Sequence, residues 1–114
     1  MTDSGTSLTN LAQGLWAAAC PRTPWPDGWA VVWGDPGQET LWEVSALGLA
    51  DFAARRIVLR RDDVFPVDTL LHEFVHVLGF GEHDARFNRR EDALRTRLGL
   101  LPTLDRYFRR GRRR

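Results

Sequence analysis

The sequence predicts a single small α+β domain with an N-terminal helix, about three mostly antiparallel strands, a central helix and a C-terminal helix. Apolar residues recur at helical spacing in residues 7–19. Two short runs, 29–33 and 56–60, are rich in the β-branched and apolar residues typical of strands. An apolar stretch of helical length then begins at Pro66. The chain of 114 residues is long enough for one domain with its own core.

The domain is expected to cover residues 1–108, followed by a basic tail at 109–114. Residues 1–6 are small and polar and are expected to be disordered. Five tryptophans are many for this length, and large aromatic side chains are most often packing residues. The tryptophans expected in the core are Trp16, Trp25, Trp29, Trp33 and Trp42.

The first helix is predicted for residues 7–19 from one apolar stripe. The stripe consists of Leu8, Leu11, Leu15 and Ala19. The helix is expected to end at Cys20-Pro21, because proline cannot continue it, and a proline-rich loop follows to Gly28.

Three strands are predicted next, at 29–33, 40–45 and 56–60. A turn rich in glycine and proline closes the first strand. The stretch 46–54 is expected to be a loop with a short helical turn.

The helix that begins at Pro66 is apolar over most of its girth and is therefore expected to be central in the core. Its apolar positions are Leu70, Leu71, Phe74, Val75, Val77 and Leu78. The segment Gly79 to Gly81 is expected to end it, because glycine can adopt the left-handed conformation. A last helix is predicted for 85–98, with another turn in 100–107.

Charge is unevenly distributed along the chain. Residues 1–84 carry five arginines against twelve acidic residues, a balance of −7, whereas residues 85–114 carry eleven arginines against three, a balance of +8. A solvated helix face followed by a frayed tail explains the basic end. The alternative is an electrostatic footprint for weak binding of nucleic acid.

Cys20 is the only cysteine, so the chain can form neither an internal disulfide nor a cysteine-based zinc finger. No signal peptide is recognised, and no apolar stretch approaches the roughly 20 residues of a membrane span. We therefore expect a cytoplasmic protein, monomeric and without a membrane partner.

The three histidines, His72, His76 and His83, all lie within twelve residues. The first two are four positions apart and so share one face of the predicted helix. Neutral imidazole is a good zinc ligand. Glu73 follows the first histidine directly, where its carboxylate can take a proton from a zinc-bound water and pass it to a leaving amine. This HExxH pattern predicts a catalytic zinc site.

A catalytic zinc site needs a third protein ligand and an open position for water. The chain must turn back to supply that ligand, and His83 follows the glycine break directly. We favour His83 and keep Glu82, Asp84 and Glu91 as alternatives. Asp84 could instead hold the far nitrogen of a ligand histidine.

The histidines have two other interpretations. They could be ordinary core residues, but a buried Glu73 without a partner would then be costly. The site could also be a non-catalytic zinc site, closed by a fourth protein ligand, with Glu73 as a bystander.

The stretch from Gly48 to Phe87 resembles the core of the small HExxH zinc metallopeptidases, the zincins, and is most similar to the SprT-like and WLM group. Those families place a strand before the HExxH helix, then a glycine-containing turn, a third histidine and an aromatic residue after a short gap. The matching pieces here are Ile57-Val58-Leu59, His72-Glu73-Phe74-Val75-His76, Gly79-Phe80-Gly81 and His83-Asp84-Ala85-Arg86-Phe87.

The resemblance implies a zincin-like fold with zinc bound by His72, His76 and His83, and Glu73 as general base and acid. It also implies that Phe87 packs the last helix against the site, and that the Ile57–Leu59 strand pairs with the substrate backbone. The chain departs from the metzincin pattern, which places its third ligand at position 82 and includes a methionine turn.

These observations predict a zinc metallopeptidase acting on a protein or peptide substrate. The alternative is a non-catalytic, zinc-stabilised binding module whose arginine-rich end binds nucleic acid or an acidic partner.

Overall fold

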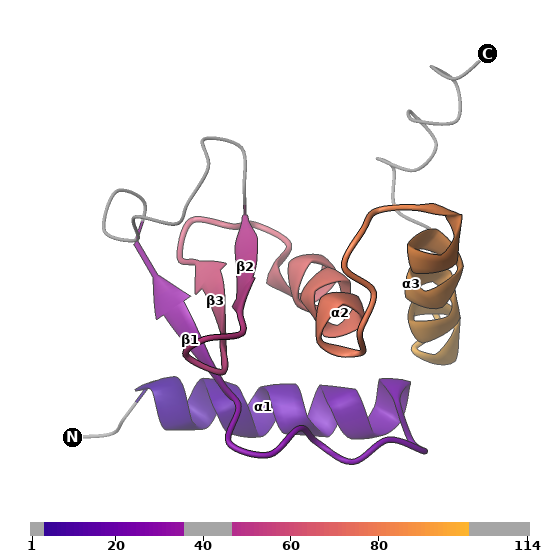
Figure 1. The fold of residues 1–114 in the computed structure, drawn as a ribbon. Helices are drawn as coiled ribbons and strands as arrows, with labels where there is room; N and C mark the ends of the chain where they lie inside the picture. The colour runs from indigo at the N-terminus through magenta and orange to yellow at the C-terminus, as the bar shows by residue number, and fades with distance from the viewer. Residues whose placement is uncertain (1–3, 36–46, 101–114) are drawn as a thin grey trace.

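The computed structural model describes residues 4–35 and 47–100 (Figure 1). Its elements are α1 (Ser4–Ala19), β1 (Ala30–Gly34), β2 (Gly48–Asp51), β3 (Arg56–Arg60), α2 (Pro66–Val77) and α3 (Ala85–Arg97). The predicted strand at 40–45, Trp42, nearly all of the turn predicted at 100–107 and the basic tail lie outside the described residues.

The predicted α+β layout is confirmed, with three helices and a three-stranded sheet. The strand order is β1-β3-β2, in which β1 runs parallel to β3 and β2 runs antiparallel to it. The sheet is therefore mixed, where the sequence predicted mostly antiparallel pairing. In Figure 1, α2 lies between the sheet and α3. Helix α1 runs below the sheet and α2.

Strand β2 lies within the stretch 46–54, which was expected to be a loop with a short helical turn. Its sequence, Gly-Leu-Ala-Asp, has little strand preference of its own. The strand forms because it pairs with β3 and packs against α2. Only the residues that follow it, 52–55, form a turn.

Strand β3 is the middle strand of the described sheet, and its residues Ile57, Val58 and Leu59 are buried. The expectation that the Ile57–Leu59 strand pairs with a substrate is therefore wrong, because both of its sides are already paired. Among the described strands, β1 and β2 are the edges.

The outer side of β1 is covered by α1. The hydroxyl of Thr9 donates to the carbonyl of Val31 at 3.2 Å and accepts from the Val31 N–H at 3.0 Å. One side chain thus satisfies both outward-facing backbone groups of that residue. This leaves β2 as the edge that borders α2.

The prediction that the tryptophans lie in the core is confirmed for those that the structure describes. Trp16 is buried, and its ring packs edge-on against Trp25 and Phe74 at centroid distances of 5.5 and 4.9 Å. Trp29 and Trp33 are partly buried against the same core. Phe74 is completely buried and lies on the side of α2 opposite the histidines. The core therefore packs against that side of the helix.

Within the described residues, no helix has both the length and the apolar character needed to cross a membrane.

Candidate metal centre

The three histidine side chains converge on one point. Nε2 of His83 lies 3.1 Å from Nε2 of His72 and 3.0 Å from Nε2 of His76. One ligand atom from each residue lies within 4.8 Å of the others. Among the described residues, this trio is the group of side chains placed to hold a metal ion.

These distances fit a shared metal ion. Two nitrogens bound to one tetrahedral zinc at about 2.0–2.1 Å are about 3.3 Å apart. The distances from Nε2 of His83 to Nε2 of His72 and of His76 are within a few tenths of an ångström of that value. A neutral imidazole has one ring nitrogen that donates a hydrogen bond and one that accepts. Nε2 atoms that face one another cannot all be donors, so the arrangement directs nitrogen lone pairs towards a common centre.

The turn after α2 brings His83 back to the helix. Gly79 adopts a φ of +110°, which an L side chain rarely takes, and the N–H of Phe80 donates to the carbonyl of Val75 at 3.2 Å. Together with the bond from the Gly79 N–H to the His76 carbonyl, this is a Schellman ending. Gly81 has no positive φ, so only Gly79 is required by backbone geometry.

The orientation of His76 is fixed by the same turn. Its Nδ1 lies 2.9 Å from the carbonyl oxygen of Phe80, so Nδ1 carries the hydrogen and donates it. Nε2 is then left with its lone pair directed at the cluster, as a metal ligand requires. Burial lowers the pKa of His76, and the Phe80 carbonyl opposes that shift.

Glu91 lies behind His72. Its Oε1 is 3.5 Å from Nδ1 of His72, and its side chain is almost completely buried on α3. A carboxylate in this place orients the ring and makes its other nitrogen a better ligand. Glu91, one of the alternative third ligands, therefore lies at Nδ1 of His72 and not beside the Nε2 atoms that converge.

Asp84 caps the N-terminus of α3. Its Oδ1 accepts a hydrogen bond from the N–H of Phe87 at 3.0 Å, and this bond lowers the pKa of the carboxyl group. The carbonyl of Phe80 and the carboxylate of Glu91 lie at the far nitrogens of His76 and His72, so Asp84 does not take that role for these two rings. Glu82 is exposed and is not part of the histidine group.

Glu73 is 5 % exposed and lies between the histidines and the sheet. The pKa of Glu73 is raised to about 7, mainly because the side chain is buried. The charge of His72 and a hydrogen bond from the backbone N–H of Ala50 lower this pKa, and the charge of Glu91 adds to the rise. The buried carboxylate therefore has a named partner on β2. A bound divalent cation would lower this pKa again, since opposite charge favours the ionised form.

Strand β2 approaches the Glu73 side chain closely at Gly48. A β-carbon at that position would lie 2.5 Å from Cγ2 of Thr69 and 3.1 Å from Oε2 of Glu73. Only glycine leaves room for this contact. The edge of the sheet is thus packed closely against the carboxylate.

Phe87 forms the base of the histidine cluster. Its ring centroid lies 4.7, 4.8 and 4.9 Å from those of His72, His76 and His83. The residue is completely buried on α3. The packing role that the resemblance implied for Phe87 matches this position.

Sequence reasoning did not identify Gly48, Ala50 or the carbonyl of Phe80 as parts of the site. Gly48 and Ala50 lie in β2, a strand that its own sequence does not indicate. The role of a backbone carbonyl cannot be predicted from the type of residue that carries it. For Glu91, a signal was present in its position four residues after Phe87, on the same face of the predicted last helix.

Comparisons of the chain with protein-family models, with curated protein sequences and with solved structures found no match.

Proposed function

We propose that the chain is a zinc-dependent metallopeptidase that hydrolyses peptide bonds. The observation that carries this proposal is the convergence of three imidazole nitrogens next to a buried carboxylate. The proposed zinc ligands are His72, His76 and His83, and Glu73 is the proposed general base and acid.

The donor set supports zinc. Imidazole nitrogen suits zinc among the common metals of proteins, and three histidines are a known catalytic ligand set. The group contains three protein ligands among the described residues, which favours an open position over a closed structural site. Bound zinc would supply a coordinated water of lowered pKa and polarise a substrate carbonyl.

Glu73 supports the hydrolytic interpretation. A carboxylate that is buried beside the ligands can take a proton from water and return it to the leaving amine. Its place between His72 and β2 keeps it within the space that a substrate would enter. Were the site purely structural, a buried acidic side chain at this position would add desolvation cost without a role.

The substrate-binding strand in this proposal is β2, in place of Ile57–Leu59. The N–H of Arg60 donates to the Leu47 carbonyl, and alternate residues of an antiparallel strand point their backbone groups to opposite sides. Gly48 and Ala50 therefore direct theirs away from β3 and towards the Glu73 side. An extended peptide that pairs there would share the Ala50 N–H with Glu73 and would carry its scissile bond past the histidines.

A Glu73→Gln variant tests the function. The change keeps the size of the side chain but removes the base, so zinc content should stay stoichiometric while hydrolysis of an unfolded protein falls by about 10²–10⁴-fold. Metal is measured by elemental analysis and hydrolysis by peptide release. Glu82→Gln is the matched control, since Glu82 is exposed and outside the cluster.

The same experiment addresses the non-catalytic alternative. If the wild-type protein binds zinc stoichiometrically but releases no peptide, the chain is a zinc-stabilised binding module. If Glu73→Gln retains full zinc-dependent hydrolysis, the proposed mechanism is wrong.

A further inference from the structure

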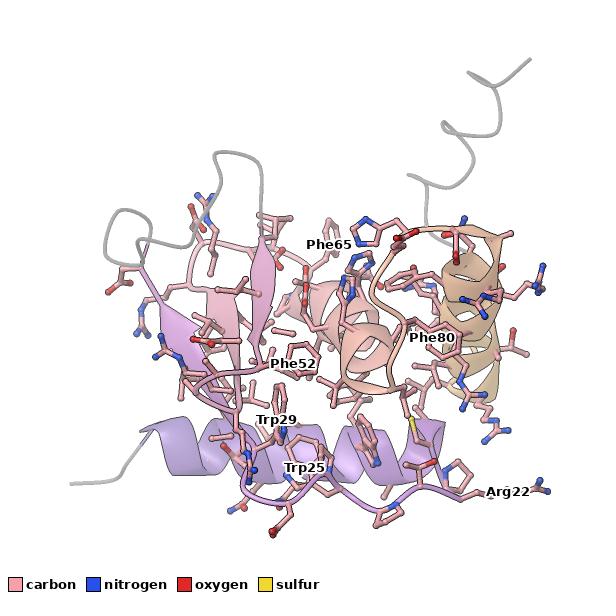
Figure 2. All side chains as sticks on the ribbon, in the orientation of Figure 1. Arg22, Trp25, Trp29, Phe52, Phe65 and Phe80 are labelled. Atoms are coloured by element: carbon pink, nitrogen blue, oxygen red, sulfur yellow. The ribbon has the colours of Figure 1, made fainter. Side chains whose placement is uncertain are left out.

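A second site is suggested by a hollow that shares no residue with the histidine cluster. It lies between the C-terminal end of α1, the loop that follows and α3, and its volume is about 140 Å³. Buried Cys20 and Leu94 line its inner part. Three exposed arginines, Arg22, Arg90 and Arg97, surround it. Figure 2 places Arg22 just beyond the end of α1.

The fold brings these arginines together from separate parts of the chain. Arg90 and Arg97 are seven positions apart, two turns along one face of α3, and Ala93 between them leaves the space open. Arg22 comes from the loop after α1, about 70 positions earlier in the sequence. A solvated face of α3 explains Arg90 and Arg97 but not Arg22, which lies in the loop after α1.

Among the residues that the structure describes, the three guanidinium groups lack the acidic partners that several other arginines have. Within the described residues, no carboxylate lines the hollow, and Arg22, Arg90 and Arg97 form no ion pair. Arginines that do pair with an acidic side chain are Arg56, Arg60, Arg61, Arg86 and Arg95. Three like charges around one hollow repel one another unless an anion is present.

The electrostatics of Cys20 agree with this convergence. Burial raises the pKa of its thiol, and the charges of Arg90 and Arg97 act against that rise. Both guanidinium groups are therefore close enough to act on one atom in the wall of the hollow.

We propose that this hollow binds a phosphate-sized oxyanion through Arg22, Arg90 and Arg97. Guanidinium groups bind phosphate oxygens through paired, charge-assisted hydrogen bonds, and the hydroxyl of Thr23 at the wall adds a further donor. The size decides the class of ligand. About 140 Å³ exceeds the roughly 30 Å³ of a water molecule but is below the 300–1,000 Å³ of pockets that enclose a whole small molecule. The hollow thus fits one phosphate group, either free or at the end of a larger molecule.

Titration of the full chain with inorganic phosphate at constant ionic strength tests the site. The chemical shifts of the Arg22, Arg90 and Arg97 side-chain N–H groups should change with a single saturable curve. Arg90→Gln or Arg97→Gln should weaken binding by about tenfold or more, since each removes charge-assisted hydrogen bonds. Arg89→Gln is the matched control, because Arg89 is an exposed arginine of α3 outside the hollow.

The proposal is overturned if phosphate gives no saturable shift, or if Arg89→Gln weakens binding as much as Arg90→Gln, which would indicate diffuse attraction to a basic face. Thermal denaturation of each variant checks that the fold is intact. A parallel titration with a single-stranded oligonucleotide identifies the source of the phosphate. Binding that depends on Arg90 and Arg97 supports a backbone phosphate of nucleic acid, and binding of free phosphate alone supports a small phosphorylated ligand.

Discussion

Glu73 and Gly48 lie in direct contact, so that the backbone of the sheet edge limits the position of the carboxylate. A β-carbon at Gly48 would lie 3.2 Å from Cγ of Glu73 and closer still to Thr69. The contact couples the strand proposed to bind substrate with the proposed general base.

The first prediction follows from this contact. Gly48→Ala should lower the free energy of unfolding by roughly 1–3 kcal/mol, because the new methyl group overpacks a filled space. It should also lower hydrolysis more than zinc content, because it displaces Glu73 and not the histidines. Chemical denaturation and peptide release measure the two effects. Gly81→Ala is the control, since no heavy atom lies within 4 Å of a β-carbon there. Equal effects of the two changes would contradict the packing argument.

The second prediction concerns the third ligand. His83→Ala should weaken zinc binding by more than 100-fold, a larger loss than removal of a residue that merely orients a ligand causes. Glu82→Gln should leave the affinity unchanged, because Glu82 is not part of the histidine group. Competition with a chromophoric chelator measures both. Should Glu82→Gln release the metal while His83→Ala keeps it, the assignment of the third ligand is reversed.

The third prediction separates two neighbouring acids. Glu91→Gln should weaken zinc binding by about 10–100-fold, because the carboxylate behind His72 makes that ring a better ligand. Asp84→Asn should have little effect on affinity, since asparagine also caps a helix. Isothermal titration with zinc compares the variants. A loss confined to Asp84→Asn would show that Asp84, and not Glu91, supports the site.

The fourth prediction tests the fold independently of metal. Cys20 is 5 % exposed and burial raises the pKa of its thiol, so at pH 8 it should react with iodoacetamide about 100-fold more slowly in the native protein than in the denatured chain. Mass spectrometry of the labelled protein over time gives both rates. Equal rates would show that the contact between α1 and α3 is not formed.

The same pKa shift sets the direction of a pH effect on stability. The folded-state pKa of Cys20 lies above the unfolded value, so the unfolded chain loses its proton first as pH rises. The stabilising contribution is complete below about pH 8.5 and is lost as pH rises through the folded-state pKa. A Cys20→Ser variant should lack this alkaline loss in denaturation experiments.

The sequence by itself determined the elements with strong local patterns. The period of α1, the β-branched run of β3 and the proline that opens α2 each predicted an element close to its observed bounds. The spacing of His72 and His76 likewise required that they share a face. These features follow from backbone geometry within a few residues, so no distant contact is needed to specify them.

Tertiary structure decided what depends on contacts between distant segments. β2 exists because β3 and α2 hold a weak sequence in an extended form, and this makes β2, and not the Ile57–Leu59 strand, the edge beside Glu73. The carbonyl of Phe80 and the carboxylate of Glu91 orient the rings from a turn and from α3. Such roles arise only when the chain packs, because the type of a residue does not reveal which backbone groups it will contact or how far it will be buried.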